Sequence, residues 1–314
     1  MMPRAAKSSR VSRSPGKPAP RLSPRPKIAA PWSLRTVQGM QILELDPLKK
    51  LPWLVHGFSM RCGGTSTLDS GERVLNLGFT DWDLRENVQR NRQAFQSAIG
   101  AGDSTLVLLK QFHSAVTLFF AAPPEQPRKG DASLTNSRGL LLAVQTADCV
   151  PILLVDARKR AIAAIHAGWR GTLARIAEKT VGEMRMHFGS NPADIFAALG
   201  PAIGSCCYEV GTDLVTEFTS QFADAEEYFD ELRTGEEPNP LQWLNMMPPG
   251  HQPPPKNVRL DLPKANRSQL LAAGLNKADI FVSDLCTACH TDLFFSYRKE
   301  RAKSGRLVSL IGLQ

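Results

Sequence analysis

Three side chains that can hold a metal stand beside short apolar segments of the sequence. Cys149 precedes the apolar run 150–155, His166 follows the run 161–165, and His113 comes shortly after the run 106–110. Charged residues separate the first two runs, a pattern typical of a strand, a turn and a second strand. Because the two open ends of a hairpin lie side by side, we expect the thiol of Cys149 and the imidazole of His166 to meet there.

Two imidazoles and one thiol form a donor set suited to Zn²⁺, and three protein ligands leave a fourth position for water or substrate. Each residue alone has a simpler interpretation, because a single His is more often packed or capping and a single Cys is usually a small buried apolar residue. Their shared placement at strand ends favours a metal site. The same donors would suit a blue-copper site, but no Met that could be its axial ligand lies within 30 residues of His113 or Cys149.

The segments that must position these residues predict an α/β or α+β fold. Apolar spacing predicts helices over 83–99, 173–188, 212–222 and 265–273. Apolar runs predict strands over 54–60, 106–110, 116–121, 140–144, 150–155, 161–165, 195–199, 280–282, 293–297 and 307–311. Strands outnumber helices without a regular βαβ repeat, so we expect a single layered domain in which helices flank mixed β-sheets.

Two segments are predicted to lie outside the regular structure. Residues 1–31 are rich in Pro, Ser, Lys and Arg and predict a disordered basic tail ahead of a catalytic domain over 36–314. A solvated tail is the preferred interpretation, and a transit peptide or a nucleic-acid-binding arm are the alternatives. Residues 234–257 contain seven prolines and no periodicity, which predicts a long loop.

The net charge of +8 comes from the tail. Residues 1–43 hold nine Lys and Arg and no acid, which leaves 29 basic and 30 acidic residues for the remainder of the chain. We therefore expect no nucleic-acid partner for the globular body. No apolar run reaches the roughly 20 residues of a membrane helix and no secretion signal is present, so we expect a cytoplasmic protein without a membrane partner. The six Cys are expected to be thiols or metal ligands.

A series of short motifs runs from about Trp53 to the C-terminus and leaves out the tail and the proline-rich loop. The motifs are RCGGTS from Arg61, LNLG from Leu75, QFH from Gln111, GDA from Gly130, TADCVP from Thr146, HAGWRGT from His166, GPAIGSCCYEV from Gly200, and CT from Cys286 with FFSYR from Phe294. In this order the motifs resemble the YfiH family, which is also called the laccase-domain or polyphenol oxidoreductase family.

The resemblance implies a single α/β domain with a zinc site that falls on His113, Cys149 and His166. It also implies an enzyme, a zinc-dependent purine nucleoside phosphorylase that uses adenosine, inosine or methylthioadenosine with inorganic phosphate as co-substrate. Adenosine deaminase is implied as a second activity. The older family name implies a copper-dependent polyphenol oxidoreductase instead, and a link of family members to peptidoglycan editing implies a third role. A four-copper laccase needs more imidazoles than the six His of this chain supply.

Phosphorolysis requires cations where phosphate attacks the ribose carbon and an electrophile or proton donor where the purine leaves. Arg170 and Arg61 are candidates to hold phosphate, since a guanidinium group matches phosphate oxygens, and we count Arg170 among the catalytic residues. A structural ion pair with Asp148 is an equal alternative for Arg170. The amides of Asn76 and Gln111 are candidates to orient the ribose or the base.

The remaining cysteines give weaker signals. Cys286, Cys289 and His290 match the C-x-x-C-H pattern of haem attachment, which means little without an export signal. Together with Cys206 and Cys207, the two cysteines of this pattern could form a second zinc site or a reactive thiol cluster, and buried packing is the preferred interpretation. The sequence makes no prediction of an oligomeric state.

Overall fold

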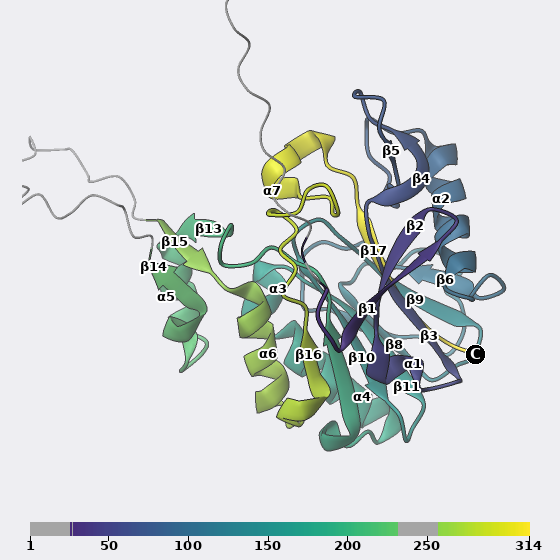
Figure 1. The fold of residues 1–314 in the computed structure, drawn as a ribbon. Helices are drawn as coiled ribbons and strands as arrows, with labels where there is room; N and C mark the ends of the chain where they lie inside the picture. Colours follow the sequence, from purple (N-terminus) through teal and green to yellow (C-terminus); the bar gives the residue numbers. More distant parts are fainter. Residues whose placement is uncertain (1–25, 27, 232–256) are drawn as a thin grey trace, which may run out of the picture.

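The computed structural model describes residues 26, 28–231 and 257–314 (Figure 1). The predicted tail therefore lies almost entirely outside the described residues, as does the predicted proline-rich loop apart from its last residue, Asn257. The first strand begins at Trp32, four residues ahead of the predicted domain start, and pairs with the strand that follows it. Within the described part of the chain, no helix combines the length and the apolar character needed to cross a membrane.

Two six-stranded mixed sheets form the centre of the molecule. The first sheet runs in the order β1 (Trp32–Val37), β2 (Met40–Leu45), β3 (Leu54–Ser59), β17 (Leu307–Leu313), β9 (Leu140–Thr146) and β6 (Thr105–Leu108). The second runs in the order β16 (Ile280–Val282), β12 (Ile195–Leu199), β10 (Val150–Asp156), β11 (Ala161–Ala167), β8 (Ala132–Thr135) and β7 (Thr117–Phe119).

The inner faces of the two sheets pack on each other. Leu153 and Ile162 of the second sheet share one apolar core with Leu142 and Ile311 of the first. Alternate residues of the same strands, such as Ile152, point to the opposite face and enter a second core. Because successive side chains of a strand point to opposite faces, β10 and β11 are buried along their whole length and read as continuous apolar runs.

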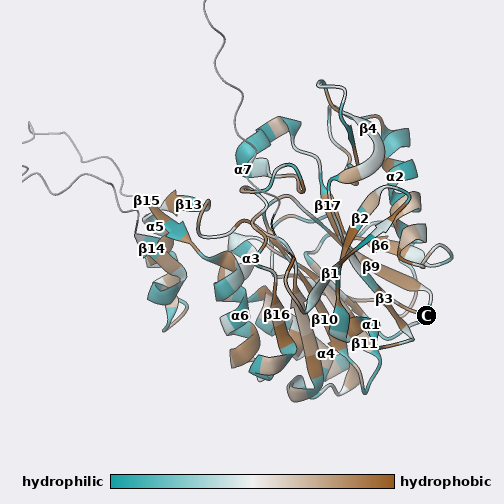
Figure 2. Ribbon diagram, in the orientation of Figure 1, coloured by the Kyte–Doolittle hydropathy of each residue, from teal (hydrophilic) through white to brown (hydrophobic). Residues whose placement is uncertain are grey.

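Helices cover the outer faces. On the second sheet lie α4 (Ile176–Phe188) and α6 (Leu262–Ala272), and on the first lies α2 (Arg85–Ala98), whose Phe95 packs against Leu141 and Leu310. In Figure 2 the central strands are mainly apolar, and the polar positions gather on these helices. The expected fold class, mixed sheets flanked by helices in layers, is therefore confirmed.

Smaller elements complete the described chain. Two minor sheets pair β4 (Cys62–Thr67) with β5 (Arg73–Val74), and β15 (Asn257–Leu260) with both β13 (Glu209–Gly211) and β14 (Phe229–Glu231). The short α-helices are α1 (Asp46–Lys49), α3 (Trp169–Leu173), α5 (Asp213–Thr219) and α7 (Tyr297–Glu300). The 3-10 turns cover Pro192–Asp194, Ala225–Tyr228, Lys277–Asp279 and Arg301–Lys303.

Two predicted elements differ from the structure. The helix predicted over 173–188 is divided between α3 and α4, because Arg175 adopts a left-handed backbone conformation with φ of 61°. The strand predicted over 293–297 is wrong. The N–H groups of Leu293 and Phe294 both donate to the carbonyl of His290, so this apolar run forms a packed turn, and Phe294 and Phe295 are buried in the core beneath it.

Candidate metal centre and its cavity

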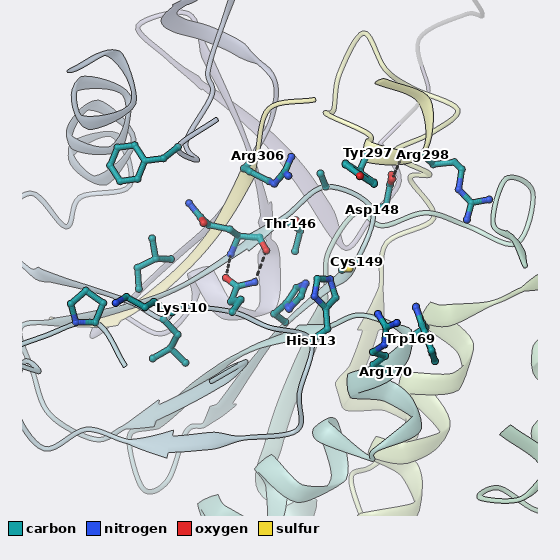
Figure 3. A pocket seen from close by; sticks show the side chains of 18 of the residues that line it. Lys110, His113, Thr146, Asp148, Cys149, Trp169, Arg170, Tyr297, Arg298 and Arg306 are labelled. Atoms are coloured by element: carbon teal, nitrogen blue, oxygen red, sulfur yellow. Dashed lines mark hydrogen bonds between the residues drawn. The ribbon is translucent and has the colours of Figure 1, made fainter. Parts of the chain in front are cut away.

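The structure brings the three predicted donors together. His113, Cys149 and His166 each offer one ligand atom, and these atoms all lie within 4.8 Å of one another. Cys149 and His166 come from adjacent ends of the predicted hairpin, where Val150 pairs with Ala167. His113 arrives from the loop after β6, and its ring centroid lies 4.9 Å from that of His166 (Figure 3). The donors therefore surround one point at the end of the second sheet.

Asp131, which directly precedes β8, organises this loop and the second histidine at once. Its carboxylate accepts hydrogen bonds from the backbone N–H of His113 at 3.0 Å and of Ser114 at 2.7 Å, and from the Ser114 hydroxyl at 2.6 Å. Asp131 Oδ1 also lies 2.9 Å from His166 Nδ1. A carboxylate that occupies one ring nitrogen directs the other toward a metal and fixes its tautomer, so Asp131 is the outer support of the donor set.

The electrostatics of the site couple the thiol of Cys149 to the imidazole of His166. Burial would lower the pKa of His166, but the charge of Cys149 and the hydrogen bond with Asp131 raise it to about 9, so a metal that binds there displaces the proton of His166. Burial alone would raise the pKa of Cys149, but the charge of His166 and hydrogen bonds from both histidines lower it to about 6. Burial would likewise raise the pKa of Asp131, and the hydrogen bonds from His166 and Ser114 lower it to about 2. Cys149 is therefore a thiolate near neutral pH, which is the state required of a metal ligand.

Two backbone positions shape the donor set: Gly168 leaves space for the donors, and Asp148 fixes the position of Cys149. A Cβ atom at Gly168 would lie 2.8 Å from His113 Cδ2 and 3.1 Å from Cys149 Sγ, so any side chain there would push into the site. Asp148, next to Cys149, has φ of 93°, a conformation that costs a residue with a side chain about 1–3 kcal/mol. Its carboxylate is held by the Thr287 hydroxyl at 2.7 Å and by the backbone N–H of Arg298 at 2.6 Å. These bonds hold Cys149 at the mouth of the hairpin.

The donor set opens into a cavity of about 1130 Å³. Figure 3 shows His113 beside Cys149, with Trp169 and Arg170 entering from the start of α3. The charged side chains of the wall, the donors aside, are seven basic residues and one acid: Arg85, Arg92, Lys110, Arg170, Arg298, Arg301 and Arg306 against Asp148. A basic, largely preformed cavity of this size suits an anionic small molecule.

Arg170 and Gln111 are the two other predicted residues that line the cavity, and they differ in how far other protein groups occupy their polar atoms. Arg170 does not pair with Asp148, whose oxygens are taken by Thr287 and Arg298, and its guanidinium carbon lies 4.3 Å from the ring centroid of Trp169. Gln111 bonds through both ends of its amide to the backbone of Gln145, at 2.8 and 2.7 Å. Among the described residues, Arg170 therefore has no acidic partner, whereas Gln111 mainly fixes the loop that carries His113.

The structure places Arg61 and Asn76 away from the cavity wall. Arg61 is buried, and its Nη1 donates to Glu300 Oε1 at 2.6 Å while its guanidinium lies over Phe295. Asn76 is fully buried, and its amide bonds to Asp83 Oδ2 at 2.8 Å and to the backbone N–H of Arg306 at 2.9 Å. Both side chains connect parts of the framework. A polar residue with this structural role looks the same in the sequence as one that binds a ligand.

Other residues of the site escaped the prediction from sequence. Asp131 stands in the GDA motif, and its burial between two loops and a strand was not visible from its neighbours. Lys110, Tyr208, Tyr297 and Arg306 belong to segments far apart in the chain and share the cavity wall. Only the fold assembles them, so no local spacing could have linked them.

Comparison with known proteins identifies relatives of the whole folded region. Residues 55–314 match the protein family described as multi-copper polyphenol oxidoreductase laccase. The chain is 35% identical over 282 residues to purine nucleoside phosphorylase YlmD of Geobacillus stearothermophilus, an alignment that covers 83% of this chain and 94% of the relative. It is 36% identical over 269 residues to a purine nucleoside phosphorylase of Deinococcus radiodurans, with 85% and 93% covered.

A solved structure has the same architecture. The crystal structure of the hypothetical protein YfiH of Bacillus licheniformis matches with a TM-score of 0.75 at 29% identity and covers 91% of this chain and 100% of that chain. The sequence matches and the structural match agree on one group of proteins. The chain therefore belongs to the YfiH family of enzymes, which is also described as the laccase or polyphenol oxidoreductase family.

Proposed function

We propose that this protein is a zinc-dependent purine nucleoside phosphorylase that acts on adenosine, inosine and methylthioadenosine, with adenosine deamination as a second activity of the same site. The observation that carries the proposal is the placement of the His113, Cys149 and His166 donors in the wall of a strongly basic cavity. Relatives named as purine nucleoside phosphorylases support the reaction type. A cytoplasmic location remains a prediction.

Phosphate binding is assigned to Arg170 and Lys110. Both line the cavity, and neither has an acidic partner among the residues that the structure describes. In the reaction, a phosphate oxygen forms a bond to the anomeric carbon of the ribose while the bond from that carbon to the purine nitrogen breaks. The guanidinium of Arg170 and the ammonium of Lys110 hold the doubly charged nucleophile and orient one of its oxygens toward the anomeric carbon, which becomes electron-poor as the bond to the purine breaks.

The purine leaves with the electron pair of the broken bond, so its end of the site needs an apolar surface and a positive or proton-donating group. Trp169 and Tyr297 offer aromatic rings in the cavity wall. Burial, followed by the charge of Cys149, raises the pKa of Tyr208 to about 12, which keeps its hydroxyl protonated as a hydrogen-bond donor. When bound to His113, Cys149 and His166, zinc would supply a Lewis acid at this end of the cavity.

A copper-dependent polyphenol oxidoreductase is the second candidate, favoured by the description of the matching family. Its trigonal site would need a weak axial ligand such as Met. Of the two nearest methionines, Met184 is buried in the core beneath α4 and Met186 is exposed, and neither lines the cavity. A role in peptidoglycan editing is the third candidate. We prefer zinc because the three donors leave a position open without an axial sulfur.

The deciding experiment incubates the purified protein with adenosine in the presence and absence of phosphate and analyses products and metal content together. We expect ribose 1-phosphate and adenine only with phosphate, and inosine in both conditions. Colour and copper content test the oxidase, and turnover of wall precursors tests peptidoglycan editing. Absence of both ribose 1-phosphate and inosine would overturn the nucleoside function.

Matched variants link the metal to the reaction. Cys149→Ala and His113→Ala are expected to abolish nucleoside cleavage and to lower the zinc content by one ion per chain, because two remaining donors hold zinc poorly. Cys62→Ala removes a thiol outside the donor set and should keep both activity and zinc. Full nucleoside cleavage by a variant that has lost this zinc would contradict the role of the metal.

A further inference from the structure

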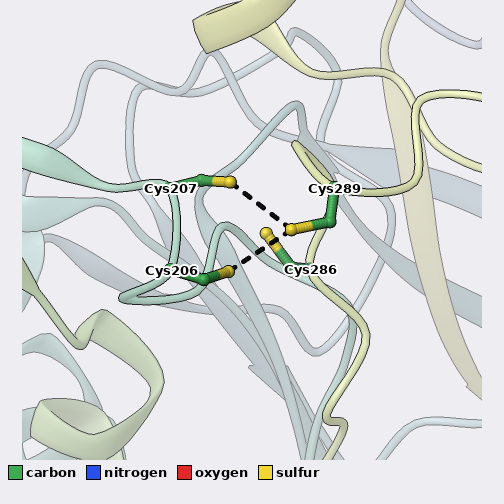
Figure 4. A group of neighbouring side chains, drawn as sticks. All are labelled: Cys206, Cys207, Cys286 and Cys289. Atoms are coloured by element: carbon green, nitrogen blue, oxygen red, sulfur yellow. Dashed lines mark hydrogen bonds between the residues drawn. The ribbon is translucent and has the colours of Figure 1, made fainter. Parts of the chain in front are cut away.

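A second cluster of donors lies outside the candidate active site. Cys206 and Cys207 belong to the turn after β12, and Cys286 and Cys289 belong to the turn after β16. Their four sulfur atoms all lie within 4.8 Å of one another, and Cys289 Sγ is 3.4 Å from both Cys206 Sγ and Cys207 Sγ (Figure 4). Buried packing, the preferred interpretation from sequence, fits only Cys286, because Cys206 and Cys289 are exposed.

The spacing of the sulfurs fits a single tetrahedral ion. Four thiolates at about 2.3 Å from one zinc lie roughly 3.8 Å from each other. A disulfide would bring two sulfurs to about 2.05 Å. A cluster with several irons would divide the four sulfurs among different metal atoms and hold them farther apart. From this geometry we propose that Cys206, Cys207, Cys286 and Cys289 form a second zinc site, closed by four protein ligands.

The two turns are already docked in the arrangement that such a site needs. The backbone N–H of Gly204 donates to Cys286 Sγ at 3.3 Å, and the backbone N–H of Thr287 donates to the carbonyl of Ala202 at 3.0 Å. Sulfurs that accept backbone N–H bonds are the usual outer support of a metal thiolate. The ligands therefore come as two pairs, one from each of two turns whose backbones are linked.

The role of this second ion is structural. All four positions of a tetrahedral ion are filled by protein, which leaves none for a substrate. Tyr208, directly after Cys207, lines the cavity, and Thr287, directly after Cys286, donates to the carboxylate of Asp148 at 2.7 Å. The ion would thus fasten the turn next to Tyr208 of the cavity wall to the turn whose Thr287 supports the residue beside Cys149. These residues act by positioning and do not touch the substrate.

The test measures zinc per chain in untagged protein purified under reducing conditions. We expect two zinc ions in the native protein and one in Cys206→Ser and in Cys289→Ser. Cys149→Ala should also retain one, which belongs to the four-thiol site, whereas Cys62→Ser should retain two. Zinc content that is unchanged in Cys289→Ser would overturn the proposal, and so would iron in place of zinc. A second outcome separates the two sites. If Cys149→Ala loses its zinc and the other variants do not, the result bears on the first site and contradicts the four-thiol site.

Two further measurements use properties of the cluster itself. Exchange of zinc for cobalt should produce intense thiolate-to-cobalt absorption that persists in Cys149→Ala and falls in Cys289→Ser to the weaker band of the single Cys149 thiolate. In the native protein, titration of thiols with a mercurial reagent should release two zinc ions, one with the single thiol of Cys149 and one with the four thiols of the cluster, which tests the site even if a variant fails to fold. A native protein in which these cysteines carry disulfides and no metal would overturn the site.

Discussion

At the scale of single residues, the candidate active site depends on a carboxylate that is not itself among the metal donors. Asp131 fixes the backbone of His113 and Ser114 and orients the ring of His166. The left-handed backbone of His113, with φ of 63°, is stabilised by these same bonds. The donor geometry therefore depends on both oxygens and on the charge of Asp131.

The change Asp131→Asn keeps the size of this side chain and removes its charge. One oxygen becomes an NH₂ group, which cannot accept the N–H of Ser114 or balance a charged His166. We expect zinc affinity at the first site to fall about 10- to 100-fold, as is typical when an outer support is lost. Competition with a chromogenic chelator measures it. Asp156→Asn, a buried acid at the other end of β10, is the control, and equal affinities for both variants would contradict this role.

Arg170→Ala tests the phosphate assignment. Removal of a charged hydrogen-bond donor is expected to cost about 1.5–3 kcal/mol of binding, which raises the KM for phosphate by roughly 10- to 100-fold. The KM for adenosine and the zinc content should change little. Steady-state kinetics with varied phosphate provides the measurement, with Arg158→Ala as the control because Arg158 pairs with Asp194 outside the cavity. An unchanged KM for phosphate would reassign Arg170.

At the scale of elements, the chain shows which parts of a fold can be predicted locally. The β10–β11 hairpin follows from two apolar runs around a charged turn, and its pairing of Val150 with Ala167 joins the predicted ends. The position of β17 between β3 and β9 depends on pairing over long distances in sequence, which no local pattern contains. The failed strand at 293–297 shows the same limit, because an apolar run that packs in a turn resembles a buried strand.

A histidine joins two strands of the first sheet. His56 in β3 is buried, and its Nε2 accepts a hydrogen bond from the backbone N–H of Leu45, the last residue of β2, at 2.9 Å. Burial, which disfavours the charged ring, lowers the pKa of His56 from 6.5 to about 4. The folded pKa is depressed, so this contribution to stability is fully present above pH 6.5 and is lost as the pH falls toward 4.

The difference in unfolding free energy between the native protein and His56→Gln isolates this group. Gln retains an acceptor for the N–H of Leu45 and does not titrate. From pH 7 to pH 4 the native protein should lose on the order of 3 kcal/mol relative to the variant, as expected for a pKa difference of this size. Urea unfolding at several pH values measures the difference. Parallel pH profiles for the two proteins would show that His56 is not held neutral.

At the scale of the whole molecule, the polar residues that do not reach the cavity hold its frame together. Arg61 lies between the first sheet and β4 and bonds to Glu300 of α7, while Asn76 bonds to the backbone just ahead of β17. Both connect the β4–β5 region to the chain segment that follows the four-thiol cluster. These bonds around the cavity therefore join segments separated by more than 200 residues in sequence.

Arg61→Met tests this structural role against phosphate binding. Breaking a buried ion pair leaves Glu300 without its partner, and we expect the free energy of unfolding to fall by on the order of 3 kcal/mol. The KM for phosphate should stay within about twofold, in contrast to Arg170→Ala. Glu300→Gln and the double variant complete a double-mutant cycle. If the unfolding free energies of the cycle are strictly additive and the KM for phosphate rises, Arg61 binds phosphate and does not act through Glu300.

The central position of β17 has a consequence for synthesis of the protein. The ribosome makes β3 and β9 long before β17, yet in the finished sheet each of them pairs with β17 along one edge. Until residues 307–313 have emerged, those two edges present backbone N–H and C=O groups without their final partner, and the first sheet stays divided into two parts. Completion of this sheet thus waits for the last of its strands, even though the hairpin that carries Cys149 and His166 is made much earlier.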